Sequence, residues 1–333
     1  MINSIVISSR VRLARNFKDL PFPNKLSDLE SANSVSRAIF EILGEDYEYR
    51  RLKHLSLNQC LMLLERHIIS KELIDNKDIS GYAISPDESI IIMINEEDHL
   101  REQCILNGFE LKNCYEKISK IDDLILNKID MAFSKDLGFL TACPTNVGTG
   151  MRASVMLFLP ALTMNGAMKQ LIESLNQNGL TVRGIYGEDS DCEGYFYQIS
   201  NKYTLGLNEQ DILELVEKNV KKIIDMEETA RKTLIQMNKS VIIDMCYRSY
   251  GTLCNCYMLS SEECLKLLSK LRFGVVCGLI KFKNAKIIDE LYTNIQMAHL
   301  IDYYNLELNP KEQTIFRAKY VSENLENKLI KGV

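Results

Sequence analysis

Residues 143–154 read CPTNVGTGMRAS, a glycine-bearing stretch between apolar runs. Gly148 and Gly150, with an alanine three positions later, formally fit the fingerprint of dinucleotide-binding folds. That fingerprint requires a strand before the glycines and a helix after them, because the helix N-terminus receives the pyrophosphate. Here Pro144 and Asn146 precede the glycines, and the strand-like run SVMLFL follows them. The stretch therefore favours a loop that leads into a strand over a dinucleotide-binding turn.

Strand and helix signals are mixed around this stretch without a regular alternation. Runs rich in β-branched and aromatic residues predict strands at residues 82–85, 89–95, 154–159, 181–185 and 195–200. Apolar residues at helical spacing predict helices at residues 115–133, 166–177 and 208–237. Because strands and helices do not alternate, the pattern predicts an α+β fold rather than a doubly wound parallel sheet.

The character of the chain changes near residues 235–245. Beyond this point strand signals become rare, and helical patterns cover residues 261–271, 284–304 and 310–331. A length of 333 residues agrees with two domains of about 100–200 residues each. The sequence thus predicts a mixed domain over residues 1–238 and a smaller helical domain over residues 239–333.

Composition limits which partners and which cellular compartment can be expected for the protein. A net charge of -5 argues against nucleic acid as the main partner, since neutralising phosphates needs a basic surface. The longest apolar run, residues 155–164, contains Pro160 and is far shorter than the roughly 20 residues of a membrane span. The N-terminus lacks the charge order of a signal peptide, so the 10 cysteines are expected to be free thiols of a cytoplasmic protein. Only Cys254 and Cys256 stand close together, so a structural zinc site is not expected.

Arginines recur in the strand-like and loop-like segments. Arg10 and Arg12 are two positions apart, which places their side chains on the same face of a strand. Further arginines of this kind are Arg101, Arg152 and Arg183. Because guanidinium groups bind phosphate bidentately, several of them without a Walker lysine predict a triphosphate site. Taken singly, each is also typical of an exposed arginine at a strand edge.

Carboxylates stand close to these arginines in the sequence. Residues 96–98 read Glu-Glu-Asp and precede Arg101, and Glu188 ends the glycine-bearing segment that begins at Arg183. Two carboxylates can hold a guanidinium by paired hydrogen bonds, and one of them can take its proton. Alone, the acidic run is also typical of a solvated turn. The glycines of residues 143–154 and 183–188 allow close approach to a ligand, or they form ordinary turns.

In this order along the chain, these segments resemble the ATP:guanidino phosphotransferase family. The segments that carry the resemblance are SSRVRLARN (8–16), NEEDHLR (95–101), CPTNVGTGMRAS (143–154), RGIYGE (183–188) and YQISN (197–201). The resemblance spans roughly residues 5–230, and five motifs in the same order are far more specific than one glycine pattern. The resemblance implies an antiparallel sheet flanked by helices, the use of ATP and Mg²⁺, and transfer of the γ-phosphoryl group to a guanidine.

The resemblance also implies a role for individual residues. Glu97 would be the base, Glu188 its guanidinium-holding partner, and Cys143 the reactive-site cysteine, although a cysteine alone is also typical of a small buried apolar residue. The implied nucleotide contacts are Ser8, Ser9, Arg10, Val11, Arg12, His67, Arg101, Arg152, Ala153, Ser154, Val155, Met156, Arg183, Gly184, Ile185, Tyr186, Gly187 and Glu188.

Within the family, the chain resembles the bacterial protein-arginine kinases. The SSRVR motif begins at Ser8, leaving no room for the helical N-terminal domain of the small-guanidine kinases, and a helical tail follows at residues 239–333. The implied function is phosphorylation of arginine side chains of proteins, which marks them for a Clp-type unfoldase and protease in the stress response. The implied partners are protein substrates, an activator protein and a second copy of the chain in a homodimer. Alternatives are a kinase of free arginine or another small guanidine, and a non-catalytic phosphoarginine-binding regulator.

Residues 313–318 depart from the pattern of that branch. Its members carry an Arg-Asp-x-x-Arg-Ala motif that binds phosphoarginine in the helical domain. Here the segment reads QTIFRA, so Gln313 and Thr314 replace the first arginine and the aspartate, and Arg317 remains. A lone arginine binds phosphate less selectively than a pocket of several charges. We therefore expect weakened or absent feedback by phosphoarginine.

Overall fold

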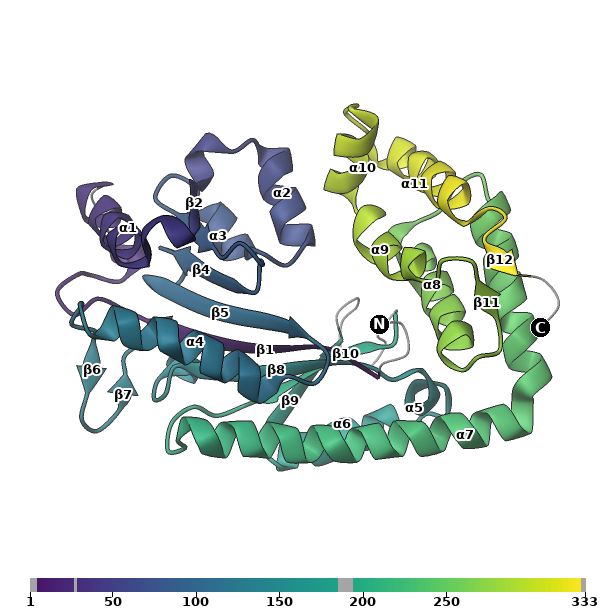
Figure 1. The fold of residues 1–333 in the computed structure, drawn as a ribbon, viewed down its shortest axis with the longest axis horizontal. Helices are drawn as coiled ribbons and strands as arrows, with labels where there is room; N and C mark the ends of the chain where they lie inside the picture. Colours follow the sequence, from purple (N-terminus) through teal and green to yellow (C-terminus); the bar gives the residue numbers. More distant parts are fainter. Residues whose placement is uncertain (1–4, 27–28, 185–193, 331–333) are drawn as a thin grey trace.

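The centre of the molecule is one eight-stranded antiparallel sheet (Figure 1). The computed structural model describes residues 5–26, 29–184 and 194–330. In spatial order the strands are β2 (Glu48–Arg51), β3 (Gly81–Ile84), β4 (Ile90–Ile94), β5 (Leu100–Asn107), β1 (Val6–Arg15), β8 (Met151–Phe158), β10 (Phe196–Asn201) and β9 (Leu180–Gly184). This sheet, with helices packed against it, confirms the predicted α+β fold.

One face of the sheet packs on helices and forms the main core. Val11 and Leu13 of β1 point to this face and are fully buried, together with Val155 of β8 and Cys104 of β5. Figure 1 shows α4 and α7 running along this face. The helices that contribute to this core are α1 (Leu29–Leu43), α4 (Leu111–Leu126), α6 (Met168–Gln177) and α7 (Glu209–Asn255). Because side chains alternate along a strand, Arg10 and Arg12 point to the opposite face.

The opposite face is covered at its two ends by different elements. Over β3 and β4, the helices α2 (Leu57–Glu65) and α3 (Lys71–Asp75) enclose a small core that includes Tyr82 and Met93. At the other end, Phe158 of β8 and Phe196 of β10 belong to the core of the C-terminal helices. The arginine-bearing stretches of β1, β5 and β8 lie between these two ends.

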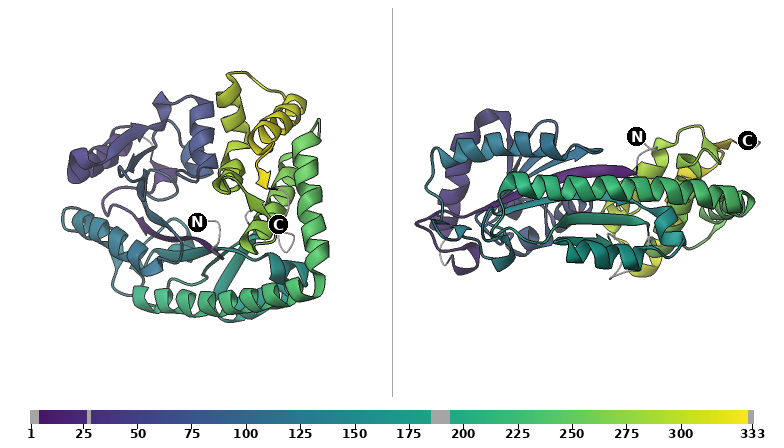
Figure 2. Two further views of the ribbon diagram at one scale, coloured as in Figure 1. Left: turned by 45° about the vertical axis from the view of Figure 1, so that its right-hand side comes forward. Right: turned by 90° about the horizontal axis from the view of Figure 1, so that it is seen from below.

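The C-terminal region begins within a single long helix. The predicted helix at residues 208–237 continues to Asn255, with a kink at Asn238, where φ is -135° and ψ is 25°. Figure 1 shows α7 running along the sheet and then turning beside the other C-terminal helices, and the right view of Figure 2 shows its length from below. The remaining C-terminal elements are α8 (Ser261–Val276), β11 (Lys281–Phe282), α9 (Lys286–Asn294), α10 (Met297–Tyr304), α11 (Pro310–Leu325) and β12 (Leu329–Ile330).

Most differences from the predicted elements lie at their ends. The strand predicted at residues 154–159 begins at Met151, because Met151, Arg152 and Ala153 also pair with β1. The helix predicted at residues 284–304 is divided into α9 and α10. Short elements complete the fold, namely the β6 (Phe133–Ser134) and β7 (Gly138–Phe139) hairpin and α5 (Pro160–Met164). Within the described ranges, no helix has the length and apolarity needed to span a bilayer.

Candidate active site

The arginine face is the part of the sheet that carries Arg10, Arg12, Arg101, Arg152 and Arg183. Arg12 of β1 stands directly opposite Arg152 of β8, and Arg101 of β5 stands opposite Ala14. Arg183 reaches the same face from β9, opposite Gln198. Four segments far apart in the sequence thus bring the predicted phosphate-binding arginines together. Since β1, β5 and β8 are interior strands, the alternative of arginines at a sheet edge is wrong for all of them except Arg183.

The arginine face has an excess of positive charge. Burial, followed by the positive charges of Arg101 and Arg152, lowers the pKa of the Arg10 guanidinium to about 9. Burial and then Arg101 also lower the pKa of Arg12, and burial and then Arg183 lower that of Arg152. Within the described part of the chain, the Nε atoms of Arg10 and Arg101 are buried without a hydrogen-bond partner. A polyanion such as a triphosphate would supply the missing negative charge and acceptors.

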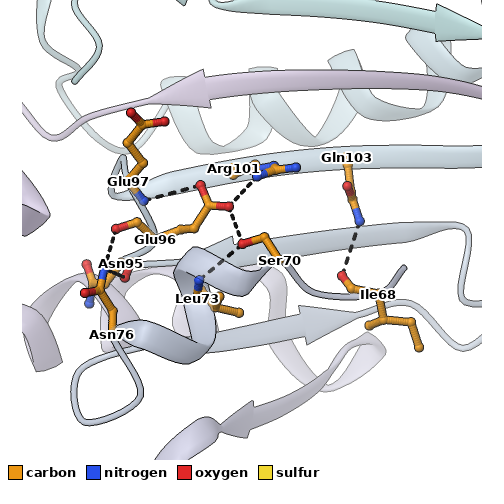
Figure 3. A network of polar contacts seen from close by, with 9 residues as sticks. All are labelled: Ile68, Ser70, Leu73, Asn76, Asn95, Glu96, Glu97, Arg101 and Gln103. Atoms are coloured by element: carbon orange, nitrogen blue, oxygen red, sulfur yellow. Dashed lines mark hydrogen bonds and ion pairs between the residues drawn. The ribbon is translucent and has the colours of Figure 1, made fainter. Parts of the chain in front are cut away.

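Two of these guanidinium groups are oriented by neighbouring side chains. Arg101 forms an ion pair with Glu96, whose carboxylate also accepts a hydrogen bond from the hydroxyl of Ser70 (Figure 3). Arg152 donates from Nε and Nη2 to the hydroxyl of Ser200, at 3.3 and 3.0 Å. Each guanidinium has five donors, so these contacts fix its direction and leave donors for a ligand.

A cavity of ≈ 190 Å³ opens on the arginine face beside the turn between β4 and β5. It joins the predicted base Glu97, the predicted reactive cysteine and most of the arginine face in one space. Its lining residues are Arg12, Leu13, Ala14, Glu96, Glu97, Asp98, Arg101, Cys143, Thr145, Asn146, Gly150, Arg152 and Arg183. A cavity lined both by several cations and by a carboxylate suits a reaction between an anionic donor and a cationic acceptor.

The three carboxylates of the β4–β5 turn differ in their surroundings. Glu96 and Asp98 are each 3% exposed and are held by hydrogen bonds, whereas Glu97 is exposed. Figure 3 shows the Glu97 carboxylate extending away from the contacts of Glu96. Desolvation, followed by the negative charges of Asp98 and Glu96, raises the pKa of Glu97. The acidic run is therefore an ordered turn that presents one carboxylate, that of Glu97, to the cavity. The alternative of a solvated turn is wrong for Glu96 and Asp98.

Asp98 connects this turn to the loop that carries Cys143. Its Oδ1 accepts from Asn16 Nδ2 at 2.6 Å and from the backbone N–H of Ala142 at 2.7 Å. Asn16 also donates to the carbonyl of Leu140 at 3.0 Å. Cys143 is partly buried, and its Sγ lies 3.0 Å from Thr145 Oγ1. These bonds hold Glu97 and Cys143 on the same cavity.

The glycines of residues 143–154 contact the protein's own backbone. Gly148 has a φ of 117°, and a Cβ added there would lie 2.3 Å from the carbonyl oxygen of Thr204. Gly150 has a φ of 65°, and its Cβ would lie 2.7 Å from the carbonyl oxygen of Ala14. The expected role in ligand approach therefore does not hold for Gly148, which is required for packing. Gly150 is required for packing and also lines the cavity.

Some predicted nucleotide contacts point away from the cavity. The side chains of Ser9, Val11, Ala153 and Val155 are buried on the core face, because each alternates with a residue of the arginine face. Their backbone groups take part in the ladder between β1 and β8. The resemblance covered whole motifs, so it did not separate the two faces of the strands.

Other predicted residues lie on the arginine face or beside it. Ser8, Ser154 and Met156 share its side by the same alternation. His67 follows α2 with a φ of 59°, and loss of hydration, followed by the positive charge of Arg10, lowers its pKa. Gly184 ends β9. The predicted residues Ile185, Tyr186, Gly187 and Glu188 lie outside the described residues.

Several residues of the site were not predicted. Asn16 and Ser200 stand inside the motifs SSRVRLARN and YQISN, so the resemblance could have drawn attention to them. Thr145 and Asn146 lie within the stretch at residues 143–154 and line the cavity beside Cys143. Ser70 has no motif around it, and its role depends on a contact that only the fold creates.

Two family models together match most of the chain. ATP:guanido phosphotransferase, C-terminal catalytic domain, matches residues 30–230, and the protein-arginine kinase McsB C-terminal domain matches residues 239–331. The protein-arginine kinase of Clostridium acetobutylicum is 45% identical over 328 residues, which cover 97% of this chain and 96% of the relative. The protein-arginine kinase of Bacillus subtilis is 40% identical over 330 residues, which cover 97% of this chain and 90% of the relative.

Solved structures agree with these sequence matches. A lombricine kinase is 29% identical with a TM-score of 0.59, over 67% of this chain and 66% of its own. A duplicated taurocyamine kinase from Schistosoma mansoni has a TM-score of 0.60 over 91% of this chain and 47% of its own; at 21% identity it shows the fold alone. The long sequence matches and the shared fold lead to one conclusion: this chain belongs to the ATP:guanido phosphotransferase family, among its protein-arginine kinases.

Proposed function

We propose that this enzyme transfers the γ-phosphoryl group of ATP to arginine side chains of proteins. The observation that carries the proposal is the cavity that joins the exposed carboxylate of Glu97 to an incompletely neutralised group of arginines. The donor substrate is a polyanion and the acceptor is a cation, so each would find opposite charge on its own side of the cavity.

On the donor side, the arginine face would bind and align the phosphates. Phosphoryl transfer passes through a loose transition state, so neutralisation and alignment contribute more than covalent help. Arg10, Arg12, Arg101 and Arg152 are aimed from rigid strands, which reduces the reorganisation needed during the reaction. His67 and Arg183 would add contacts at the two sides of this group.

On the acceptor side, Glu97 would act as the base. A guanidinium is a poor nucleophile while it is fully protonated, so a carboxylate must accept its proton as the nitrogen attacks. The N–Pγ bond then forms, the bond from Pγ to the ADP oxygen breaks, and the proton goes to Glu97. The resemblance assigns Glu188 to the second carboxylate and Cys143 to a position beside the guanidinium, and the position of Cys143 on the cavity supports that part.

Mg²⁺ would enter with ATP as part of the substrate. Among residues 5–26, 29–184 and 194–330, no group of three His, Cys, Asp or Glu side chains could hold a metal ion. Mg²⁺ commonly keeps several of its waters and is bound largely through the phosphates of the nucleotide, so ATP itself would carry the ion into the cavity. When bound, the ion neutralises charge on the phosphates.

The choice of a protein substrate over free arginine is tested with one assay. An unfolded, arginine-containing protein and free arginine are each incubated with enzyme and MgATP, and phosphoarginine is measured by mass spectrometry under conditions that preserve this acid-labile group. We expect ATP-dependent phosphoarginine on the protein. Phosphoarginine formed from free arginine alone would show that the protein is a small-guanidine kinase. No phosphoarginine in either reaction would favour a non-catalytic regulator.

Feedback by phosphoarginine is expected to be weak in this chain. Arg317 is 5% exposed and donates to the carbonyls of Ile295 and Leu259, at 2.9 and 3.1 Å. These bonds hold the guanidinium within the helical region, and Gln313 and Thr314 add no charge. We expect free phosphoarginine to leave the rate unchanged in a titration; sigmoidal activation would contradict this.

We further propose two domains, residues 1–238 and 239–333, and a homodimer formed through the second. The kink at Asn238 and the separate family models on either side of it support this division. A cytoplasmic location, an activator protein and delivery of products to a Clp-type unfoldase in the stress response complete the proposal. The described cysteines are free thiols, as a reducing compartment favours. A single 38.2 kDa species in analytical ultracentrifugation would contradict the dimer.

A further inference from the structure

Glu65, the last residue of α2, caps a helix of the C-terminal region. Its two carboxylate oxygens accept from the backbone N–H groups of Ala298 and His299, at 2.8 and 3.2 Å. The His299 ring lies within 2.6 Å of the same carboxylate. The side chains of Glu65 and His299 are only 16% and 13% exposed. A negative charge is thus placed at the first turn of α10, where it is most favourable.

This cap replaces one that α10 lacks locally. Gln296, at the N-cap position of α10, makes no capping hydrogen bond with its side chain. The first N–H groups of a helix need acceptors, and here a residue more than two hundred positions earlier supplies them. Asn58 of α2 adds a second bond by donating to the carbonyl of Ala298 at 3.2 Å. The two helices are therefore joined by directional contacts as well as by packing.

The residues that follow Glu65 are attached to the arginine face. Ser70 donates to Glu96, which pairs with Arg101, and the carbonyl of Ile68 accepts from Gln103 at 3.3 Å (Figure 3). Gln103 and Arg101 are both on β5. His67 lies between these positions, and burial, followed by the positive charge of Arg10, lowers its pKa. A short segment therefore connects the cap on α10 with the side chains that would hold the phosphates.

We propose that Glu65 is a positioning residue for the nucleotide site, which it braces against the C-terminal helical region. Loss of the cap frees the end of α2 and the segment at residues 66–70, so Arg101 and Glu96 lose their fixed direction. This rests on the proposed function insofar as the arginine face binds the nucleotide. The C-terminal region would thereby influence nucleotide affinity without any of its residues entering the cavity.

The test compares Glu65→Ala with Glu65→Gln in the full-length protein, with MgADP as the probe. Isothermal titration calorimetry is performed at a temperature at which circular dichroism shows each variant folded. We expect Glu65→Ala to weaken MgADP binding about fivefold or more, in the usual range of coupling between distant sites. Glu65→Gln keeps one acceptor oxygen in place and should recover part of the affinity. The KM for ATP should rise more than the KM for the protein substrate.

The matched control is Ser260→Ala, which removes the side chain that accepts from the backbone N–H of Glu263 at the N-cap of α8, another helix of the C-terminal region. Its MgADP affinity should equal that of the wild type; an equal loss in both variants would overturn the proposal. So would a folded Glu65→Ala protein with unchanged affinity. If Glu65→Ala does not fold, Asn58→Ala is expected to weaken MgADP binding at least about twofold, and an unchanged value overturns the proposal.

MgADP binding needs no phosphate acceptor, so the two proposals can fail separately. If the wild type makes no phosphoarginine while Glu65→Ala binds MgADP more weakly, the proposed function fails and the role of Glu65 stands. If the wild type makes phosphoarginine and Glu65→Ala binds MgADP normally, the proposed function stands and the role of Glu65 fails.

Discussion

Arginines on the two faces of the central sheet differ in whether an opposite charge accompanies them. On the core face, Arg15 donates to both oxygens of Asp122, at 2.9 and 2.7 Å, and to the carbonyls of Ala14 and Thr149. The ring of Phe139 lies 3.6 Å from its guanidinium carbon. Three positions earlier on the same strand, Arg12 makes no ion pair with any described residue, and burial, followed by the charges of neighbouring arginines, lowers its pKa. One strand thus holds a structural arginine paired with a carboxylate and an arginine without an ion pair to any described residue.

This difference in charge pairing indicates that Arg15 serves stability and that the arginine face serves binding. Burying a charge is tolerated where hydrogen bonds and an opposite charge accompany it, as they do for Arg15. Placing like charges together opposes folding, so the arginine face is maintained at a cost in stability that a bound polyanion would offset. The unsatisfied face is therefore the one to expect at a binding site, and the satisfied face is the one to expect in a core.

The largest expected effects come from replacing Arg12 and, in a separate variant, Arg15 by methionine. Arg12→Met should weaken MgADP binding by about 100-fold, since it removes one partner of a charged contact. Its free energy of unfolding should stay the same or rise by up to about 1 kcal/mol. Arg15→Met should lower the free energy of unfolding by about 3–5 kcal/mol, because it leaves Asp122 buried and unpaired. Calorimetry measures the MgADP affinity of both variants, and denaturant unfolding measures their stability. If Arg12→Met lost stability and Arg15→Met lost only MgADP affinity, the division between a binding face and a core face would be wrong.

A smaller effect is expected from Gly148→Ala, which tests whether this glycine serves packing. We expect a loss of about 2–3 kcal/mol in unfolding free energy, from the positive φ and the contact with the Thr204 carbonyl. MgADP affinity of the folded protein should be retained. Gly44→Ala is the control, since Gly44 also has a positive φ but no atom within 4 Å of an added Cβ. If Gly148→Ala were as stable as Gly44→Ala, the packing role would be wrong.

The smallest expected effect is a shift in pH dependence. Glu97 must be deprotonated to act as the base, so kcat/KM should rise as the pH increases through its pKa. Because burial and the neighbouring carboxylates raise that pKa, the acidic limb should lie above the ordinary glutamate value of about 4.3. A pH–rate profile of the wild type measures the limb. A limb at or below the ordinary value would argue that Glu97 is not the titrating group.

The sequence was sufficient for the parts of the site that depend on local pattern. Period-two alternation correctly placed Arg10 and Arg12 on one face, and the strand after Gly150 excluded a dinucleotide-binding turn. The motif order led to the family. The same reasoning did not separate Val11 and Val155, which point to the core, from the arginines beside them.

The remaining features depend on contacts between distant segments. The bond of Ser70 to Glu96, the clamp between Asp98 and Ala142, and the cap that Glu65 places on α10 have no local signature. Gly148 likewise packs against Thr204, whose position only the folded chain fixes. Such contacts arise from packing, so no pattern within a single segment could have predicted them.

The most direct measurement is phosphoryl transfer by Glu97→Gln, made together with its affinity for MgADP. The amide has nearly the same shape as the carboxylate but cannot accept the proton of the guanidinium. We expect kcat for protein-arginine phosphorylation to fall by about 100-fold or more, while MgADP affinity stays close to that of the wild type. A Glu97→Gln enzyme that phosphorylates arginine at a near-normal rate would contradict the assignment of Glu97 as the base of this cavity.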